Sequence, residues 1–425
     1  MIRMRILRAF LVLAALTAAH ARQAVAQTTV EALPIDEAVS QAREANPALR
    51  AARLRADVAA ERVPQAGALP NPMLRFALMN RQIQDFGSTA EPMLQNRIEF
   101  SQRLPWPGKL GFSEDRWELL ASAGVLDAEE TEQALIARVK AVYYRLAFMD
   151  RALLIMEDTR ELLREFLDVS STLYAVGEGL QQDVLQAQVA VASMTEDITV
   201  VEQDRLATAA RLNALLGRQA TVGIDELELP PPGEELPTVE SLMSLADAQR
   251  PGLQAARERA RAADAGYRAA RRAIYPDFTV GVAYSQRPEF NDWLSFTVGI
   301  SLPLWAGKSH LPLRREMAAM QAEEEARAID LYNETFARIA ERRAESERAR
   351  KLVALYSTSV LPQARAAVES ALSAYRVGKV DFMTLVQNEL TVNRFEIESV
   401  RLAAEYQQAV GELEALVASD LGGAP

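Results

Sequence analysis

A short segment of the chain occurs twice, at residues 174–179 and again at residues 375–380. The copies read Tyr-Ala-Val-Gly-Glu-Gly and Tyr-Arg-Val-Gly-Lys-Val. Two further pairs precede them in the same order: Leu-Pro-Trp-Pro-Gly-Lys at 104–109 matches Leu-Pro-Leu-Trp-Ala-Gly-Lys at 302–308, and Asn46-Pro47 matches Arg250-Pro251. The sequence therefore predicts a tandem duplication. A duplicated unit cannot normally bury its own apolar face, so it packs on copies of itself within or between chains.

The duplication divides the 425 residues into two repeats joined by a linker. We expect the first repeat at 27–225, the linker at 226–237 and the second repeat at 238–425. The linker is rich in Pro and Glu, and its prolines exclude a continuous helix. A chain of this length could hold two or three ordinary domains, but the duplication favours one elongated molecule made of two halves.

Residues 1–26 have the pattern of a secretory signal peptide. Basic residues precede an apolar run at 9–19, and an Ala-Val-Ala segment ends at Ala26, which is the spacing of a signal peptidase site. Cleavage is predicted after Ala26, with Ala21 as the alternative. An N-terminal membrane anchor is the competing interpretation, but the run is shorter than the roughly 20 residues of a spanning helix.

The mature chain is acidic and contains no cysteine. The formal net charge is −11, and removal of the signal, which holds four arginines and no acid, makes it about −15. This balance argues against nucleic acid as a partner. Without cysteine there is neither a disulfide nor a lipid-bearing N-terminal Cys. No apolar run after the signal reaches the length of a spanning helix, so any membrane passage would use strands.

Alternating apolar and polar residues predict a β-hairpin in each repeat, at about 72–104 and about 277–303. Each predicted strand has one apolar face and one small or polar face. A half-buried hairpin of a soluble domain would show the same alternation. The segment lengths, roughly 9–11 residues, favour tilted strands that cross a bilayer. A polar loop joins the first two strands and contains Asp85, Gly87, Ser88 and Pro92.

Apolar residues at a spacing of three and four predict long helices outside the hairpins. The first repeat should hold helices at 36–62, 108–174 and 181–216, and the second should hold helices at 309–375 and 381–417. At 1.5 Å per residue, the helix at 108–174 would be roughly 100 Å long. We interpret the apolar stripes as helix packing.

Residues suited to catalysis are scarce. The two histidines are His20, in the signal, and His310, so a zinc site or a nucleophile–His–acid site has almost no support. The acidic run at 323–325 fits a solvated helix face. Gly177 and Gly179 follow a helix rather than a strand, unlike a phosphate-binding loop. We therefore expect no enzyme activity, no catalytic or metal-binding residue and no cofactor.

The four predicted strands are too few to close a barrel in one chain. An open sheet edge inside lipid leaves backbone groups unpaired at several kcal/mol each, so copies must share a barrel. Two copies would give eight strands and a filled interior, whereas three would give twelve and begin to hold water. The sequence therefore predicts a homotrimer.

The mature chain resembles outer-membrane factors of the TolC type, on the segments 102–109, 174–187 and 375–388. The resemblance implies a mixed membrane fold, in which a long α-helical coiled-coil barrel in the periplasm continues into a transmembrane β-barrel of twelve strands, four from each protomer. It also implies the exit duct of a tripartite efflux pump, with a periplasmic adaptor and, through it, an inner-membrane pump as partners.

Within this family, the Pro-Trp-Pro-Gly-Lys segment at 105–109 is similar to the CzcC and CusC-like cation-efflux branch. By this resemblance the cargo would be heavy-metal cations. Efflux of drugs or other small molecules and a type I secretion duct stay open. The rival from another class is a periplasmic adaptor or structural protein with helical hairpins, which would not explain the four amphipathic strands.

The resemblance also assigns roles to single residues. The ends of the long helices would meet the adaptor, through Tyr174, Val176, Gly177, Tyr375, Val377 and Gly378. Family channels close at this end partly with acidic residues; Asp183 matches that pattern, Thr384 stands at the equivalent position of the second repeat, and Asp381 is the substitute candidate. Indole rings favour membrane interfaces, where Trp106 and Trp305 would lie on the periplasmic side and Trp293 at the opposite rim.

Overall fold

The computed structural model describes residues 33–81, 83, 86, 93–288, 290–375 and 377–421. The predicted signal peptide at 1–26 lies outside the described residues, as do Asp85, Gly87, Ser88 and Pro92 of the first hairpin loop.

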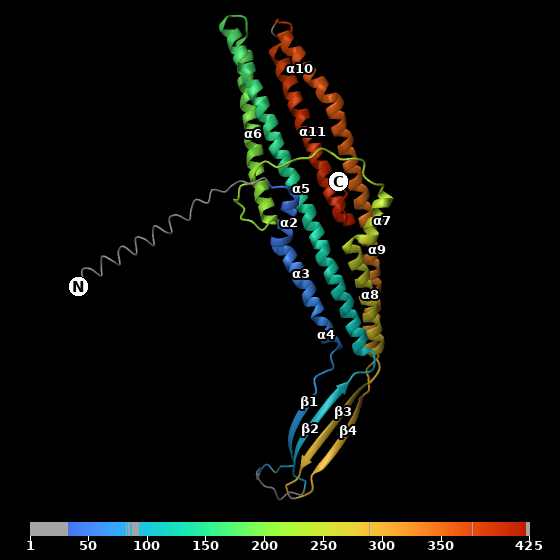
Figure 1. Cartoon of the computed structure of the whole chain (residues 1–425). Helices are drawn as coiled ribbons and strands as arrows, with labels where there is room; N and C mark the ends of the chain where they lie inside the picture. The colour runs from blue at the N-terminus through green and yellow to red at the C-terminus, as the bar shows by residue number, and fades with distance from the viewer. Residues whose placement is uncertain are drawn as a thin grey trace, which may run out of the picture. The chain divides into compact units, whose positions relative to one another are not determined.

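Both repeats contain helices, a pair of strands and then a long helical hairpin, in that order (Figure 1). This shared order confirms the tandem repeat. The first repeat forms α2 (Ile35–Ala45), α3 (Pro47–Ala60), α4 (Arg62–Gly67), β1 (Met73–Met79), β2 (Gln95–Leu104), α5 (Lys109–Ala175) and α6 (Gln181–Leu215). The second forms α7 (Val239–Gln249), α8 (Pro251–Arg272), β3 (Asp277–Gln286), β4 (Trp293–Ser301), α9 (His310–Leu355), the π-helical turn η1 (Tyr356–Val360), α10 (Leu361–Tyr375) and α11 (Phe382–Val417).

The helix expected at 36–62 is wrong as a single element, because the chain breaks at Asn46 and continues as α3 and then α4. The Asn46 side chain accepts hydrogen bonds from the N–H groups of Ala48 (2.9 Å) and Leu49 (3.2 Å). Pro47 follows at the first position of α3, where a missing N–H is harmless. An N-cap and a proline at N1 start a new helix here.

The helix expected at 309–375 is also not uniform. Between α9 and α10, the N–H of Leu361 bonds to the carbonyl of Tyr356, five residues back, and forms the π turn η1. Pro362 follows, and its ring has no N–H for the carbonyl of Thr358. In the first repeat, by contrast, α5 runs through 67 residues without interruption, as predicted.

The residues divide into two compact units, each with its own core. One unit contains 33–38, Val142–Leu229 and Ala364–Ile397, and the other contains Val39–Ala141, Pro230–Gln363 and the chain from Glu398 onward. The core of the first unit joins α5, α6, α10 and α11 through Leu163, Phe166, Ala187, Met194, Ile198, Ala371, Tyr375, Phe382, Leu385 and Val386. A core of the second unit joins α7, α8, α9 and α11 through Leu242, Met243, Ala246, Leu253, Ile339, Leu413, Leu416 and Val417.

The second unit also holds an antiparallel sheet with the strand order β1-β2-β3-β4. One row of paired residues across the four strands is Phe76, Ile98, Tyr284 and Leu294, and the adjacent row on the opposite face is Arg75, Glu99, Ala283 and Ser295. The apolar face is open, since Phe76, Phe296 and Val298 are 70%, 79% and 75% exposed. The alternation predicted from the sequence is therefore confirmed. Within the described part of the chain, no helix is both long and apolar enough to cross a membrane.

Candidate functional site

Two helix-reversing turns lie in the first unit, one between α5 and α6 and the other between α10 and α11. Gly177 and Gly378 have φ values of +81° and +69°, a backbone region that favours glycine. The N–H groups of Glu178 and Lys379 each bond at 2.9 Å to the carbonyl five residues back, at Leu173 and Ala374. This is the pattern in which a left-handed glycine ends a helix. A glycine therefore ends a helix in the same way in both copies.

The tyrosines of the two copies differ in environment. Tyr174 is 49% exposed, whereas Tyr375 is 8% exposed and packs edge-on against Phe382, with ring centroids 5.6 Å apart. Burial, and then the charge of Asp183, raise the pKa of the Tyr375 phenol. Val176 and Val377 are equally open, each at 66% exposure. The valines and Tyr174 are therefore accessible at this end of the unit, and Tyr375 belongs to its core.

Asp381 caps α11. Its Oδ1 accepts hydrogen bonds from the N–H (3.2 Å) and from the hydroxyl of Thr384. Both bonds lower the pKa of the Asp381 carboxyl, and the bond from the hydroxyl has the larger effect. Thr384, which the repeat alignment places opposite Asp183, therefore holds a carboxylate in position one turn earlier.

Asp183 lies in the first turn of α6, near Asp381. Burial is the larger cause of its raised pKa, and the charge of Asp381 is the second. The structure thus brings together the two gate candidates, from different repeats, with the core residue Tyr375 beside them. The cap lowers the pKa of the Asp381 carboxyl, and the pKa of the neighbouring Asp183 carboxyl is raised.

The Leu-Pro-Trp-Pro-Gly-Lys segment at 104–109 connects the sheet to α5. The Trp106 ring stacks on Tyr275 and Phe278, with centroids 5.1 Å and 5.7 Å apart. Asp277 Oδ1 accepts hydrogen bonds from the backbone N–H of Trp106 (3.1 Å) and from Lys109 Nζ (2.7 Å). This segment therefore has a structural role at the junction, independent of any cargo.

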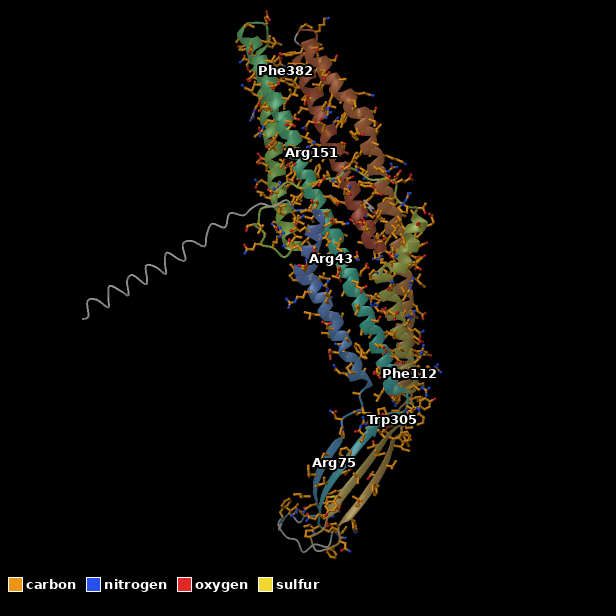
Figure 2. All side chains as sticks on the ribbon, in the orientation of Figure 1. Arg43, Arg75, Phe112, Arg151, Trp305 and Phe382 are labelled. Carbon is orange, nitrogen blue, oxygen red and sulfur yellow. The ribbon has the colours of Figure 1, made fainter. Side chains whose placement is uncertain are left out.

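The other two tryptophans predicted at a membrane interface differ in position. Trp305 follows β4 and is 76% exposed (Figure 2). Trp293 pairs with Ser285 in the sheet, which places it on the polar face, and Arg287 lies over its ring at 4.5 Å from the centroid. The strand register therefore does not support a lipid-facing position for Trp293.

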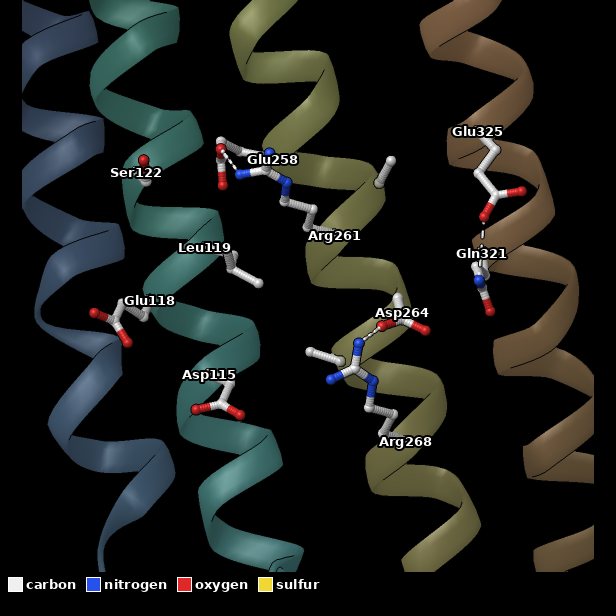
Figure 3. A pocket seen from close by; sticks show the side chains of 12 residues that line it. Asp115, Glu118, Leu119, Ser122, Glu258, Arg261, Asp264, Arg268, Gln321 and Glu325 are labelled. Carbon is white, nitrogen blue, oxygen red and sulfur yellow. Dashed lines mark hydrogen bonds and ion pairs between the residues drawn. The ribbon is translucent and has the colours of Figure 1, made fainter.

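An open groove in the second unit is lined by α5, α8 and α9 (Figure 3). Both of its arginines pair within α8, Arg261 with Glu258 at 2.7 Å and Arg268 with Asp264, and three further carboxylates line it, Asp115, Glu118 and Glu325. Among the described residues, no three His, Cys, Asp or Glu side chains form a potential metal site. The groove is consequently a polar helix surface rather than an enclosed ligand pocket.

Sequence reasoning did not identify an ion pair in the second unit in which Arg250 is buried and Glu130 is partly exposed. Arg250 is 6% exposed, and its guanidinium bonds to Glu130 Oε1 (2.6 Å) and to the Thr335 hydroxyl (2.6 Å). Glu130 Oε2 accepts from the N–H of Gly252, in the first turn of α8. Asn46 caps the equivalent helix of the first repeat. The replacement of Asn46 by Arg250 in the repeat alignment was the sequence signal that a carboxylate from elsewhere must cap α8.

Solved outer membrane channels share this fold. VceC from Vibrio cholerae is 18% identical, with a TM-score of 0.77 over 91% of this chain and 96% of that chain. MtrE from Neisseria gonorrhoeae, in an open state, is 17% identical, with a TM-score of 0.75 over 92% of this chain and 90% of that chain. CusC is 17% identical, with a TM-score of 0.76 over 92% and 93%. No curated protein sequence matches the chain.

The fold is thus that of a channel protomer. The model of the outer membrane efflux protein family matches residues 38–218 and 242–419, most of both repeats. The chain belongs to the outer membrane efflux protein family.

Proposed function

We propose that three copies of this chain form the outer-membrane channel of a tripartite efflux system, passing cargo passively from a periplasmic adaptor and an inner-membrane pump to the exterior. The observation that carries this proposal is the sheet. Its apolar face is exposed, and its outer strands β1 and β4 each pair on one side within the described chain. Such edges need further strands in lipid, and three chains would close a twelve-stranded barrel.

The division into a signal at 1–26, repeats at 27–225 and 238–425 and a linker at 226–237 forms part of the proposal. The two ranges matched by the family model fall within the two repeats, which supports it. We also propose Trp305 and Trp106 as aromatics of the periplasmic interface, and we leave Trp293 out. Heavy-metal cargo stays a prediction. Its sequence basis is the segment at 105–109, and that segment has a structural role at the junction whatever the cargo is.

Membrane extraction tests the proposed channel. The protein should fractionate with the outer membrane, require detergent for release, migrate as a trimer until it is heated, and form pores in planar bilayers. A protein that leaves the periplasm without detergent and forms no pores would instead be a soluble helical adaptor.

We also propose that the two turns of the first unit contact the adaptor through Tyr174, Val176 and Val377. Val176→Asp combined with Val377→Asp should abolish co-purification of the adaptor from cross-linked cells. The change in folding stability should stay within about 0.5 kcal/mol, because both side chains are exposed. Val200→Asp is the matched control, since Val200 is 56% exposed on α6 outside the turn. Equal adaptor recovery with all variants would remove the turns from the interface.

A further inference from the structure

We propose that the polar face of the four-stranded sheet is an anion-preferring section of the channel, and that its cargo is anionic or neutral rather than a free metal cation. This inference rests on the proposed channel function, because the polar face lines a passage only in a closed barrel.

The charged residues of the strands all lie on one face. In the strand register, Arg75 lies opposite Glu99, Arg97 lies between Ala77 and Ser285, and Arg103 lies opposite Thr279. All of these positions are on the polar face. Asp277, opposite Ser301, is the remaining charged strand residue. The described residues of the opposite face include no acid or base.

Both carboxylates of this face already have cationic partners. Glu99 pairs with Arg97 at 3.4 Å, and Asp277 pairs with Lys109 at 2.7 Å. Among the described residues, Arg75 and Arg103 form no ion pair, and Arg75 has a contact to the Met73 sulfur at 3.6 Å. Two positive charges per chain therefore stand outside the ion pairs of this face, with Arg103 also within electrostatic reach of Asp277, although the whole chain carries a net charge of −11.

Most side chains of β3 and β4 on the polar face are small. On β3 and β4 the polar face presents Gly281, Ala283, Ser295 and Gly299, whereas Arg75 and Arg103, on β1 and β2, are exposed. The arginines are therefore the longest exposed groups of this face near their positions. In a trimer they would place six such positive charges around one passage. Fixed charges of one sign in a narrow low-dielectric passage raise the local concentration of the opposite ion and repel a divalent cation more than a monovalent one.

The carboxylates of Asp183 and Asp381, in the same chain, favour cations instead. They lie in the first unit, away in sequence from the strands, and they would attract cations. A selectivity measurement on the unaltered channel would combine both sections. The sheet is therefore best tested where Asp183 and Asp381 are both neutral.

The test uses the full-length trimer in planar bilayers under a KCl gradient, with Asp183→Asn combined with Asp381→Asn as the background. This background should pass chloride in preference to potassium. Arg75→Gln combined with Arg103→Gln should lower the chloride-to-potassium permeability ratio by a factor on the order of 2 to 10, because potentials of a few kT act at such surfaces. Glu99→Gln, on the same face, is the matched control and should raise the ratio.

A second measurement concerns the cargo. Liposomes that contain the background channel should release carboxyfluorescein faster than a cationic dye of similar size, and the double arginine variant should lose this difference. Gel migration as a heat-sensitive trimer shows that each variant is assembled. Assembled pores whose ion ratio is unchanged in the arginine variant, or shifts in the same direction in Glu99→Gln, would overturn the inference and leave the channel function intact. A wild-type protein without pores would overturn the channel function itself.

Discussion

Replacement of Glu130 by alanine is expected to destabilise the second unit by about 3 kcal/mol, the lower end of the cost of leaving one member of a buried ion pair alone, because Arg250 is buried but the Glu130 side chain is 28% exposed. Arg250 is 6% exposed and would keep its charge without the carboxylate that now binds it at 2.6 Å and 3.1 Å. The first turn of α8 would lose its bond from the Gly252 N–H as well.

The measurement is urea unfolding of the detergent-solubilised protein, followed by the helical circular dichroism signal. Glu132→Ala is the matched control, two residues further along α5. Glu132 pairs with Arg43 and Arg53, which are 47% and 54% exposed, so its loss should cost less than about 1 kcal/mol. Equal effects of the two substitutions would show that the Arg250 pair is not the more strongly stabilising one.

Replacement of Asp183 by asparagine is expected to remove the pH dependence of channel conductance near the acidic end of the range. The pKa of Asp183 is raised by burial and by Asp381. The arrangement seen here is therefore favoured at low pH, where Asp183 is protonated, and loses stability as pH rises through the raised pKa. Above that pH two carboxylates repel each other in each protomer, and the pore should open more often.

The wild-type conductance should therefore increase with pH, while Asp183→Asn should stay at the low-pH value. A coupling of about 1 kcal/mol between charge and opening corresponds to a conductance difference of about fivefold at neutral pH. Asp381→Asn keeps a side-chain oxygen that can cap α11, so this variant removes the charge and leaves the cap in place. Glu178→Gln, an exposed carboxylate in the same turn, should leave the profile unchanged. An unaltered pH profile in Asp183→Asn would remove Asp183 from the gate.

Local patterns were sufficient for much of the fold. The alternation predicted a hairpin at about 72–104, where β1 and β2 run from Met73 to Leu104, and the three-and-four spacing predicted α5 within one residue at each end. The sequence also placed Gly177 and Gly378 at the ends of the long helices, and both have a positive φ there. These features depend on periodicity and on backbone sterics, which act over a few neighbouring residues.

Breaks within the helices were harder to predict. Asn46-Pro47 and Leu361-Pro362 both interrupt a helical pattern, yet the first starts a capped new helix and the second follows a π turn. The difference lies in which hydrogen bonds replace the missing one. Apolar periodicity continues through both sites and does not indicate which hydrogen bonds form there.

By itself, the sequence determined the duplication, the strand faces and the long helical hairpins, because each is set by contacts between near neighbours along the chain. Only the tertiary structure decided that Asp183 lies near Asp381, that Glu130 binds Arg250 and that Tyr375 is buried while Tyr174 is exposed. These pairs join residues far apart in the sequence. The charge that a carboxylate carries depends on the groups packed against it, and packing is a property of the folded chain.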